Sequence, residues 1–547
     1  MLNRTICVVA IILLAAHAPL GLNDGLIMDD WLVLKPRPDY AVDLDFLLRG
    51  AGHPIFFGYY SLANLTLDPI LFMKTAALTA IFCGCICLFL AARRSNLLSE
   101  TEAVGFSLIV WTYPGYQIWA GKGNAVYVVS FGFFCIGAWL LTLAWSAKGP
   151  IHVALRVATA LAFFLSFALN STMVLFAFTM LGLFVAVWRA SQHEHGSIQH
   201  FVMSAWRCIS GYPELVLLPF IYWGILNIWF ARSGVYSGHY NAHIPALGEL
   251  MDGWRVFFTS AYRSVLAHGV RAAADNRISF ALAACLVASG FLLLRPTVER
   301  SLVPAKSVVL PLLLSPIVFL ALSLPYLIAG LRASDHFYES RHLLMFGVPS
   351  ALGLLAIKRM AEKVIGARAA FFIVFGLAST LSIAILWNGY AFMQARALKQ
   401  QALSNHLASM PKPGATVFNV DDGFRDYPSQ RAPFGIPEVT GMLRLAWGNQ
   451  PFLGFTSRIE RPTVLQEMEL HRTSPGSAYH HIDPSGPQAT ISFQPGPAAV
   501  SYTALAQHYY ACRLLLRCDV PAFLMQLGLV TINVAPIAGL TPLDHRN

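Results

Sequence analysis

Long apolar runs recur along this chain, and they restrict its fold more than any other feature. A helix needs roughly 17–25 mostly apolar residues to cross a bilayer, and a backbone in lipid must satisfy its hydrogen bonds internally. We therefore predict an all-α polytopic membrane bundle of about 11 transmembrane helices. The runs lie near residues 5–21, 68–92, 103–119, 125–145, 152–169, 171–188, 213–231, 278–295, 308–330, 342–357 and 369–392.

The charge content supports a membrane protein. Charged residues make up 12% of the chain, whereas soluble proteins carry about 25%. The net charge of +10 is explained by basic cytoplasmic loops, and it does not require nucleic acid as a partner. Each loop that an inside N-terminus would place in the cytoplasm carries Lys or Arg, so we predict that orientation. The motif AHA at 16–18 resembles a signal-peptide cleavage site, but Pro19 follows it, so we expect the first helix to be retained.

Two domains are predicted from the change in composition near residue 400. Residues 1–399 would form the membrane domain, with outer loops at 22–67 and 232–277. Residues 400–547 contain more Pro, Gly, Ser and His and no continuous apolar run of spanning length. They predict a small α/β or mostly-β extracytoplasmic domain. The loop 232–277 is rich in aromatic residues; it would either lie flat on the membrane or cap the bundle.

Two cysteines, Cys512 and Cys518, lie in the predicted outer domain. An oxidising compartment would allow them to pair. A turn between them would bring them close enough, whereas a continuous helix would not. The sequence leaves the disulfide open.

Two adjacent acids follow the first apolar run, in the sequence LIMDDWLV at 26–33. One interpretation is that Asp29 and Asp30 end a membrane helix and that Trp31 anchors it at the interface. The other is a functional site, which is favoured by the second acid and by the further acids and the sequence GAGHP in the same loop.

These residues resemble a known family. A short first span, the DDW sequence directly after it and a downstream GHP are similar to the GT-C glycosyltransferases, most closely to bacterial members that modify cell-surface polysaccharides and carry a DDW…GRP pattern. His53 stands where arginine is usual. The motif covers about residues 29–54, and the expected architecture of helices, outer loops and outer C-terminal domain covers most of the chain.

The resemblance implies a chemistry for the acid pair. GT-C enzymes take a sugar from a polyprenyl phosphate, and a first-loop acid serves as the general base or holds a divalent cation. We expect these roles at Asp29 and Asp30, and Mg²⁺ or Mn²⁺ as the cation if one is used. Trp31 and His53 are expected to contact substrate.

The leaving phosphate needs a cation on the same side of the membrane. Arg341 and His342 lie in SRHLL, which resembles the RYLLP-like start of a late helix in several GT-C proteins, with His342 where tyrosine is common. Arginine suits a phosphate because it binds two oxygens at once. Further candidates for contacts with the substrate are Arg332, His336, Lys35 and Lys122.

We therefore predict a hexosyl- or pentosyltransferase of polysaccharide biosynthesis, in the bacterial plasma (inner) membrane. It would move a sugar from a polyprenyl-phosphate-linked donor to a cell-envelope glycan or lipid acceptor on the outer face, with inversion at the anomeric carbon. Membrane lipids are the other expected partners. The alternatives are a lipid-linked glycan polymerase or ligase and a non-enzymatic lipid flippase or transporter. A transporter is disfavoured because the apolar runs carry almost no acids.

Overall fold

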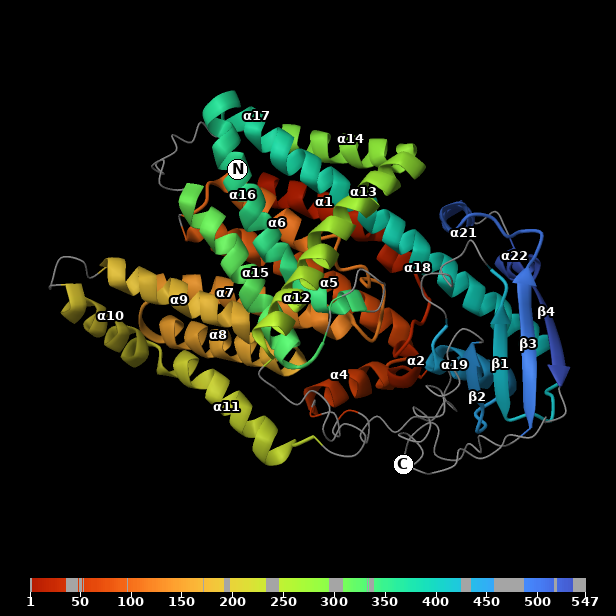
Figure 1. The fold of residues 1–547 in the computed structure, drawn as a ribbon. Coiled ribbons are helices and arrows are strands. Elements are labelled where there is room, and N and C mark those ends of the chain that lie inside the picture. The colour runs from red at the N-terminus through yellow and green to blue at the C-terminus, as the bar shows by residue number, and fades with distance from the viewer. Residues whose placement is uncertain are drawn as a thin grey trace.

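Apolar helices form most of the molecule, and a small sheet lies at one side of them (Figure 1). The computed structural model describes residues 2–35, 48, 52, 54–95, 97–170, 172–190, 197–232, 245–294, 308–331, 333, 339–424, 434–456, 487–515 and 519–534.

Within this part of the chain, 7 helical segments are long and apolar enough to cross a membrane. A further pair, α10 (Ser197–Gly211) and α11 (Pro213–Trp229), passes the same test together but is bent by 70°, so the number rises to 8 if the pair forms one span. The predicted multi-pass helical class is confirmed, but the number of about 11 spans is not confirmed. The 7 segments are α1 (Leu2–Leu22), α5 (Pro69–Arg94), α7 (Ala125–Ser146), α8 (Gly149–Leu169), α15 (Val309–Ile328), Ser340–Ile365 and Ala367–Ser409.

Two of these segments are not regular α-helices throughout. Ser340–Ile365 begins in the 3₁₀ helix η4 (Glu339–Phe346) and continues as α16 (Gly347–Ile365). Ala367–Ser409 comprises α17 (Ala367–Phe371), the π-helical turn η5 (Phe372–Gly376) and α18 (Leu377–Ser409).

Shorter helices complete the helical part of the described chain. Of the predicted spans, 171–188 and 278–295 form α9 and α14, which are apolar but shorter. The shorter helices are α2 (Asp30–Val33), α4 (Pro54–Leu65), α6 (Glu100–Trp111), α9 (Met173–Ala190), α10 (Ser197–Gly211), α11 (Pro213–Trp229), α12 (Leu247–Phe258), the π-helical turn η2 (Thr259–Arg263), α13 (Ser264–Asp275) and α14 (Arg277–Leu293).

The predicted span 103–119 is helical only as far as Trp111. Its helix, α6, begins at a capping box formed by Ser99 and Glu102. The chain then continues without regular structure to Asn124, and nearly all of this stretch is buried. Irregular backbone at membrane depth is tolerated where protein surrounds it, so α6 and the loop after it cross the bundle together.

Polar contacts define the two ends of the bundle. At one end, Arg94 in the last turn of α5 donates to Ser146 at the end of α7 at 2.5 Å, and Thr5 of α1 donates to Glu100 of α6 at 2.8 Å. Arg359, in the last turns of α16, pairs with the N-terminal part of α6 at the same end. The end of α1, the start of α7 and the start of α16 therefore lie at the opposite end.

The described part of the predicted second outer loop, residues 245–277, contains α12, η2 and α13 and packs on the bundle. Phe257 is fully buried and stacks on Phe346 with ring centroids 5.6 Å apart. Tyr113 donates to the carbonyl of Ala261 at 2.8 Å.

A four-stranded sheet forms the C-terminal part, as the α/β alternative predicted. Its strands are β1 (Val417–Asp422), β2 (Leu453–Thr456), β3 (Gln488–Pro495) and β4 (Gly528–Val534), in the order β2-β1-β3-β4. β1 is parallel to β2 and β3, and β4 is antiparallel to β3. The helices of this part are α19 (Ile436–Trp447), α21 (Tyr502–Leu515) and α22 (Val520–Leu527).

The long helix α18 joins the bundle to the sheet (Figure 1). It has 33 residues and runs unbroken through residue 400, where composition predicted a boundary. Its last turns are buried although they carry charged and polar side chains, because α19 and the sheet pack around them. The domain bounds stay a prediction.

Cys512 on α21 is disulfide-bonded. Cys518, the partner that the sequence proposed, lies outside the described residues.

Candidate functional site

The turn after α1, residues 26–33, carries Asp29 and Asp30 and is called the acidic turn here. One of its two aspartates holds it in place. Asp30 begins α2, and its exposed fraction is 0%. One carboxylate oxygen accepts hydrogen bonds from the backbone N–H groups of Ile27 at 2.9 Å and Lys122 at 3.0 Å. The other accepts from the N–H of Gly123 at 2.5 Å. Asp30 therefore ties the turn after α1 to the loop before α7.

Gly123 leaves room for this contact. A Cβ atom at this position would lie 2.8 Å from Oδ1 of Asp30, which is closer than packing allows. The carbonyl of Gly123 accepts a hydrogen bond from the hydroxyl of Tyr60 on α4. Three separate segments of the chain thus meet at this glycine.

The neighbouring aspartate is exposed. Asp29 is the N-cap residue of α2 but makes no capping hydrogen bond with its side chain. Met28, directly before it, has a φ of 50°, and it is the only non-glycine residue of the described chain with a positive φ. Such a conformation costs about 1–3 kcal/mol and persists where the surroundings enforce it, often at functional sites. The turn therefore presents one carboxylate outward and buries the other.

A buried lysine accompanies Asp30. Lys122 is 2% exposed, and its ammonium group donates to Oδ1 of Asn23 at 2.9 Å. Burial raises the pKa of Asp30 to about 6, although Lys122 and the three N–H groups oppose the shift. The charge of Lys122 therefore favours the ionised form of Asp30 in this dry environment.

Arg341 lies at the same end of the bundle as the acidic turn. The backbone N–H of Gln117 donates to Oγ of Ser340, next to Arg341, at 3.0 Å. Tyr116 interacts electrostatically with both Asp30 and Arg341. The irregular loop between α6 and α7 therefore contacts the acidic turn through its last residues and the start of η4 through its middle. Arg341 itself is half-buried.

The other predicted residues fall into two groups. His342 is 8% exposed, and its ring lies 4.9 Å from that of Tyr326 on α15. Lys35 is exposed, and its backbone N–H donates to Asn64. The predicted residues that lie outside the described part of the chain are His53, Arg332 and His336.

Trp31 packs inward. It is 3% exposed, and its indole N–H donates to the carbonyl of Leu26 at 3.1 Å. Its ring lies against Gly441 of α19, where a Cβ atom would come within 2.3 Å of Trp31 Cε3. Figure 1 shows α2 beside α19. The C-terminal part therefore contacts the acidic turn directly.

Sequence reasoning missed a second ionic group beside the turn. Asp24 pairs with Lys74 at the start of α5 and with Arg513 on α21. Burial raises the pKa of Asp24, but the hydrogen bonds from the two cations outweigh it and lower the pKa below its usual value. No local pattern reveals this group, since Arg513 lies 489 positions away from Asp24.

The described residues offer little for a metal ion. They contain no group of three or more His, Cys, Asp or Glu side chains placed to hold one. Both oxygens of Asp30 already accept backbone hydrogen bonds, which leaves only Asp29 of the expected pair as a ligand. The expected Mg²⁺ or Mn²⁺ therefore stays a prediction.

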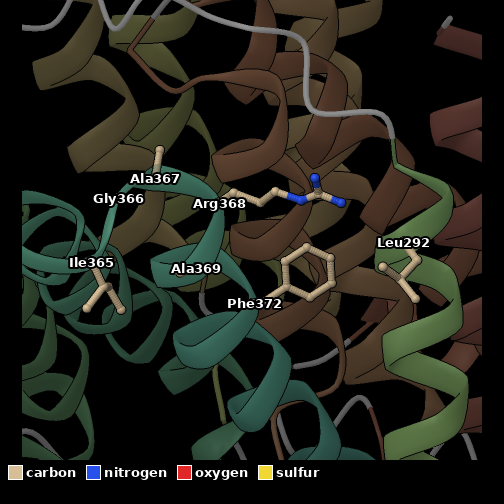
Figure 2. Close-up of a pocket in the computed structure, with 7 residues that line it drawn as sticks. All are labelled: Leu292, Ile365, Gly366, Ala367, Arg368, Ala369 and Phe372. Carbon is tan, nitrogen blue, oxygen red and sulfur yellow. The ribbon is translucent and has the colours of Figure 1, made fainter.

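Two hollows lie in different places. An open cleft of about 580 Å³ lies between α14 and the junction of α16 and α17. Figure 2 shows Arg368 above the ring of Phe372, on the side that faces Leu292. This cleft lies at the end of the bundle opposite the acidic turn. A much smaller void of about 10 Å³ lies between α18 and the loop after α6, and its lining includes Tyr116, Trp119 and Tyr390.

Comparisons with known proteins concern the fold. No protein-family model and no curated protein matches the chain. A solved structure of ArnT from Cupriavidus metallidurans bound to undecaprenyl phosphate is similar over 98% of this chain and 99% of its own, with 10% identity and a TM-score of 0.35. The apo state of that protein has the same coverage, with 13% identity and a TM-score of 0.31. Because both TM-scores are below 0.5, the proposals below rest on this chain's own residues.

Proposed function

We propose that this chain is an integral membrane glycosyltransferase that uses a sugar linked to polyprenyl phosphate. The acceptor would be a glycan or lipid of the cell envelope, on the outer face of the bacterial plasma membrane. The main support is the acidic turn, in which Asp29 is exposed while Asp30 is anchored by three N–H groups. An exposed carboxylate on a fixed turn is suited to take a proton from a bound acceptor.

In the proposed reaction, Asp29 removes the proton from an acceptor hydroxyl. The oxygen of that hydroxyl forms a bond to the anomeric carbon, and the bond between that carbon and the phosphate oxygen breaks. The electron pair leaves with the polyprenyl phosphate, and the proton remains on Asp29. Direct displacement of this kind inverts the anomeric configuration, because no covalent enzyme intermediate forms.

Arg341 is the proposed partner of the leaving phosphate. A guanidinium group binds two phosphate oxygens at once and keeps its charge at any working pH. The half-buried position of Arg341 at the start of η4, at the same end of the bundle as Asp29, supports this role. Interactions of this kind accelerate the reaction when they strengthen as charge gathers on the leaving oxygen.

Asp30 has a different proposed role from that of Asp29. Its oxygens are saturated by backbone donors and it has no exposed surface. We assign it to anchoring the turn on which Asp29 lies.

Transfer by the purified protein tests this function. Wild-type protein, Asp29→Asn and the control Asp252→Asn would be incubated with radiolabelled polyprenyl-phosphate sugars and an envelope extract. Asp252 is an exposed acid on α12, so its variant controls for the loss of one surface charge. We expect transfer to fall by about 10²–10⁴-fold in Asp29→Asn, because a general base contributes that much, and to persist in the control. Full transfer by Asp29→Asn would contradict the assignment, and movement of lipid across vesicles without transfer would favour a flippase.

A further inference from the structure

The acidic turn contacts the C-terminal part at two glycines of one helix. Gly441 of α19 faces Trp31, and an added Cβ would lie 2.3 Å from the indole ring. Gly435, which caps the start of α19, faces Met28, where an added Cβ would lie 3.0 Å from the sulfur atom. The residues on either side of the acid pair therefore contact α19 or its cap, and at Gly441 a larger side chain would collide with the indole ring.

Helix α19 is itself held to the membrane helix α18 by a buried ion pair. Nε of Arg396 donates to Oε1 of Glu438 at 3.0 Å, and a second guanidinium nitrogen donates to Oε2. Gln400 donates to the same carboxylate at 2.8 Å. Glu438 is 0% exposed, and Arg396 is 1% exposed. Separating these two buried charges would leave each of them unpaired without water, which is strongly unfavourable. The ion pair therefore fixes α19 relative to α18.

The acidic turn is held by two sets of contacts, those of Asp30 and those of its neighbours with α19. The hydrogen bonds of Asp30 hold the backbone of the turn to the loop before α7, whereas Met28 and Trp31 set how the turn is rotated against α19. Met28 has the strained positive φ, and Asp29 follows it directly. A change in the surface of α19 would therefore rotate the segment that carries Asp29.

We propose that α19 is a positioning element for the transfer reaction, and that Gly441 and Trp31 are positioning residues that aim the carboxylate of Asp29. This inference rests on the proposed function. It gives the C-terminal part a role at the reacting end of the bundle, in addition to any role in guiding the acceptor.

A bulkier side chain on α19 tests the proposal. Gly441→Val would displace Trp31 and, through it, Asp29. We expect kcat to fall by about 10²-fold, the loss that a displacement of about 1 Å can cause, with little change in the KM for donor. The matched control is Gly414→Val, because Gly414 is exposed and an added Cβ there meets nothing within 4 Å. Unchanged kcat in Gly441→Val, or an equal loss in Gly414→Val, would overturn the proposal.

Thiol labelling reads the geometry of the turn without any transfer. Asp29→Cys would be prepared in the wild-type and Gly441→Val backgrounds and treated in membrane vesicles with an impermeant maleimide, and chains without the added cysteine would serve as the blank. We expect the labelling rate at position 29 to change in the Gly441→Val background. An unaltered rate overturns the positioning role whether or not Asp29 is the base, whereas full transfer by Asp29→Asn overturns the proposed function instead.

Rescue separates positioning from a general loss of folding. Adding Trp31→Leu to Gly441→Val would restore room between the two segments. We expect kcat and the labelling rate to move back toward their wild-type values in the double variant. A double variant with the summed losses of the two single variants would contradict direct coupling between these residues.

Discussion

Asp29 and Asp30 are adjacent in sequence, but their surroundings differ completely. Asp29 is exposed, while Asp30 is enclosed by three backbone donors. The sequence identified the pair but left their roles open. Two of the donors to Asp30 lie 92 and 93 positions further along the chain, so no local pattern shows that they meet. The sequence gives no sign that Lys122 is buried beside these donors.

Replacement of the buried acid should affect stability more than replacement of the exposed one. In Asp30→Asn one carboxylate oxygen becomes an NH2 group, which cannot accept a hydrogen bond and would face at least one backbone N–H donor. We expect a loss of about 1–3 kcal/mol in the free energy of unfolding, the typical cost of an unsatisfied buried group. Thermal unfolding of the solubilised protein measures it, with Asp29→Asn as the control that should unfold like the wild type. Equal unfolding temperatures for all three proteins would contradict the anchoring role.

The pH dependence of stability offers a second readout for Asp30. Burial raises its pKa from 3.8 to about 6, so between these values the folded state binds more protons than the unfolded state. The contribution of Asp30 to stability is therefore greatest below about pH 4 and is lost as the pH rises to about 6. Unfolding measured across this range should show that slope in the wild type and a weaker slope in Asp30→Asn. If both proteins showed the same slope, the pH dependence of stability would come from groups other than Asp30.

At the scale of elements, the length of an apolar run predicted the helix well where contacts with distant segments did not change the local structure. The run 68–92 became α5 almost residue for residue. The run 103–119 became a helix of only 12 residues followed by irregular backbone. Pro114 disfavours helix there, and the many buried contacts that stabilise the loop come from distant segments. The buried charges of α18 were also beyond prediction, since their partners belong to α19 and β1.

The ion pair between α18 and α19 can be tested by paired substitutions. Glu438→Gln would leave Arg396 buried without its counter-charge, and we expect a loss of about 3–5 kcal/mol in stability. Arg396→Met with Glu438→Met removes both charges, and we expect it to recover most of that loss. Thermal unfolding of the solubilised variants measures both. A double variant that is no more stable than Glu438→Gln would contradict the interpretation.

At the scale of the whole molecule, the structure is a multi-pass bundle with a small α/β part attached through α18. Composition alone predicted this class, because few charges and many long apolar runs suit only a membrane bundle. The contact between α19 and the acidic turn could not be predicted, because it joins segments about 400 positions apart, with Gly441 against Trp31 and Gly435 against Met28. Our interpretation places this contact and the acidic turn outside the cytoplasm.

Reporter fusions test that orientation. Alkaline phosphatase, which is active only outside the cytoplasm, would be fused after residue 547 and, separately, at Lys148 between α7 and α8. We expect activity from the first fusion and none from the second, because the turn at Lys148 lies at the end of the bundle with the basic loops. The reverse pattern would place the acidic turn in the cytoplasm and would contradict an outer-face reaction.

Donor binding and sugar transfer, measured on one preparation of Asp29→Asn, test the proposed reaction most directly. We expect this variant to bind the polyprenyl-phosphate sugar as tightly as the wild type, since Arg341 is intact, and to transfer it at least about 10²-fold more slowly. Transfer at the wild-type rate would show that the exposed aspartate is not the base, and the proposed mechanism would then be wrong.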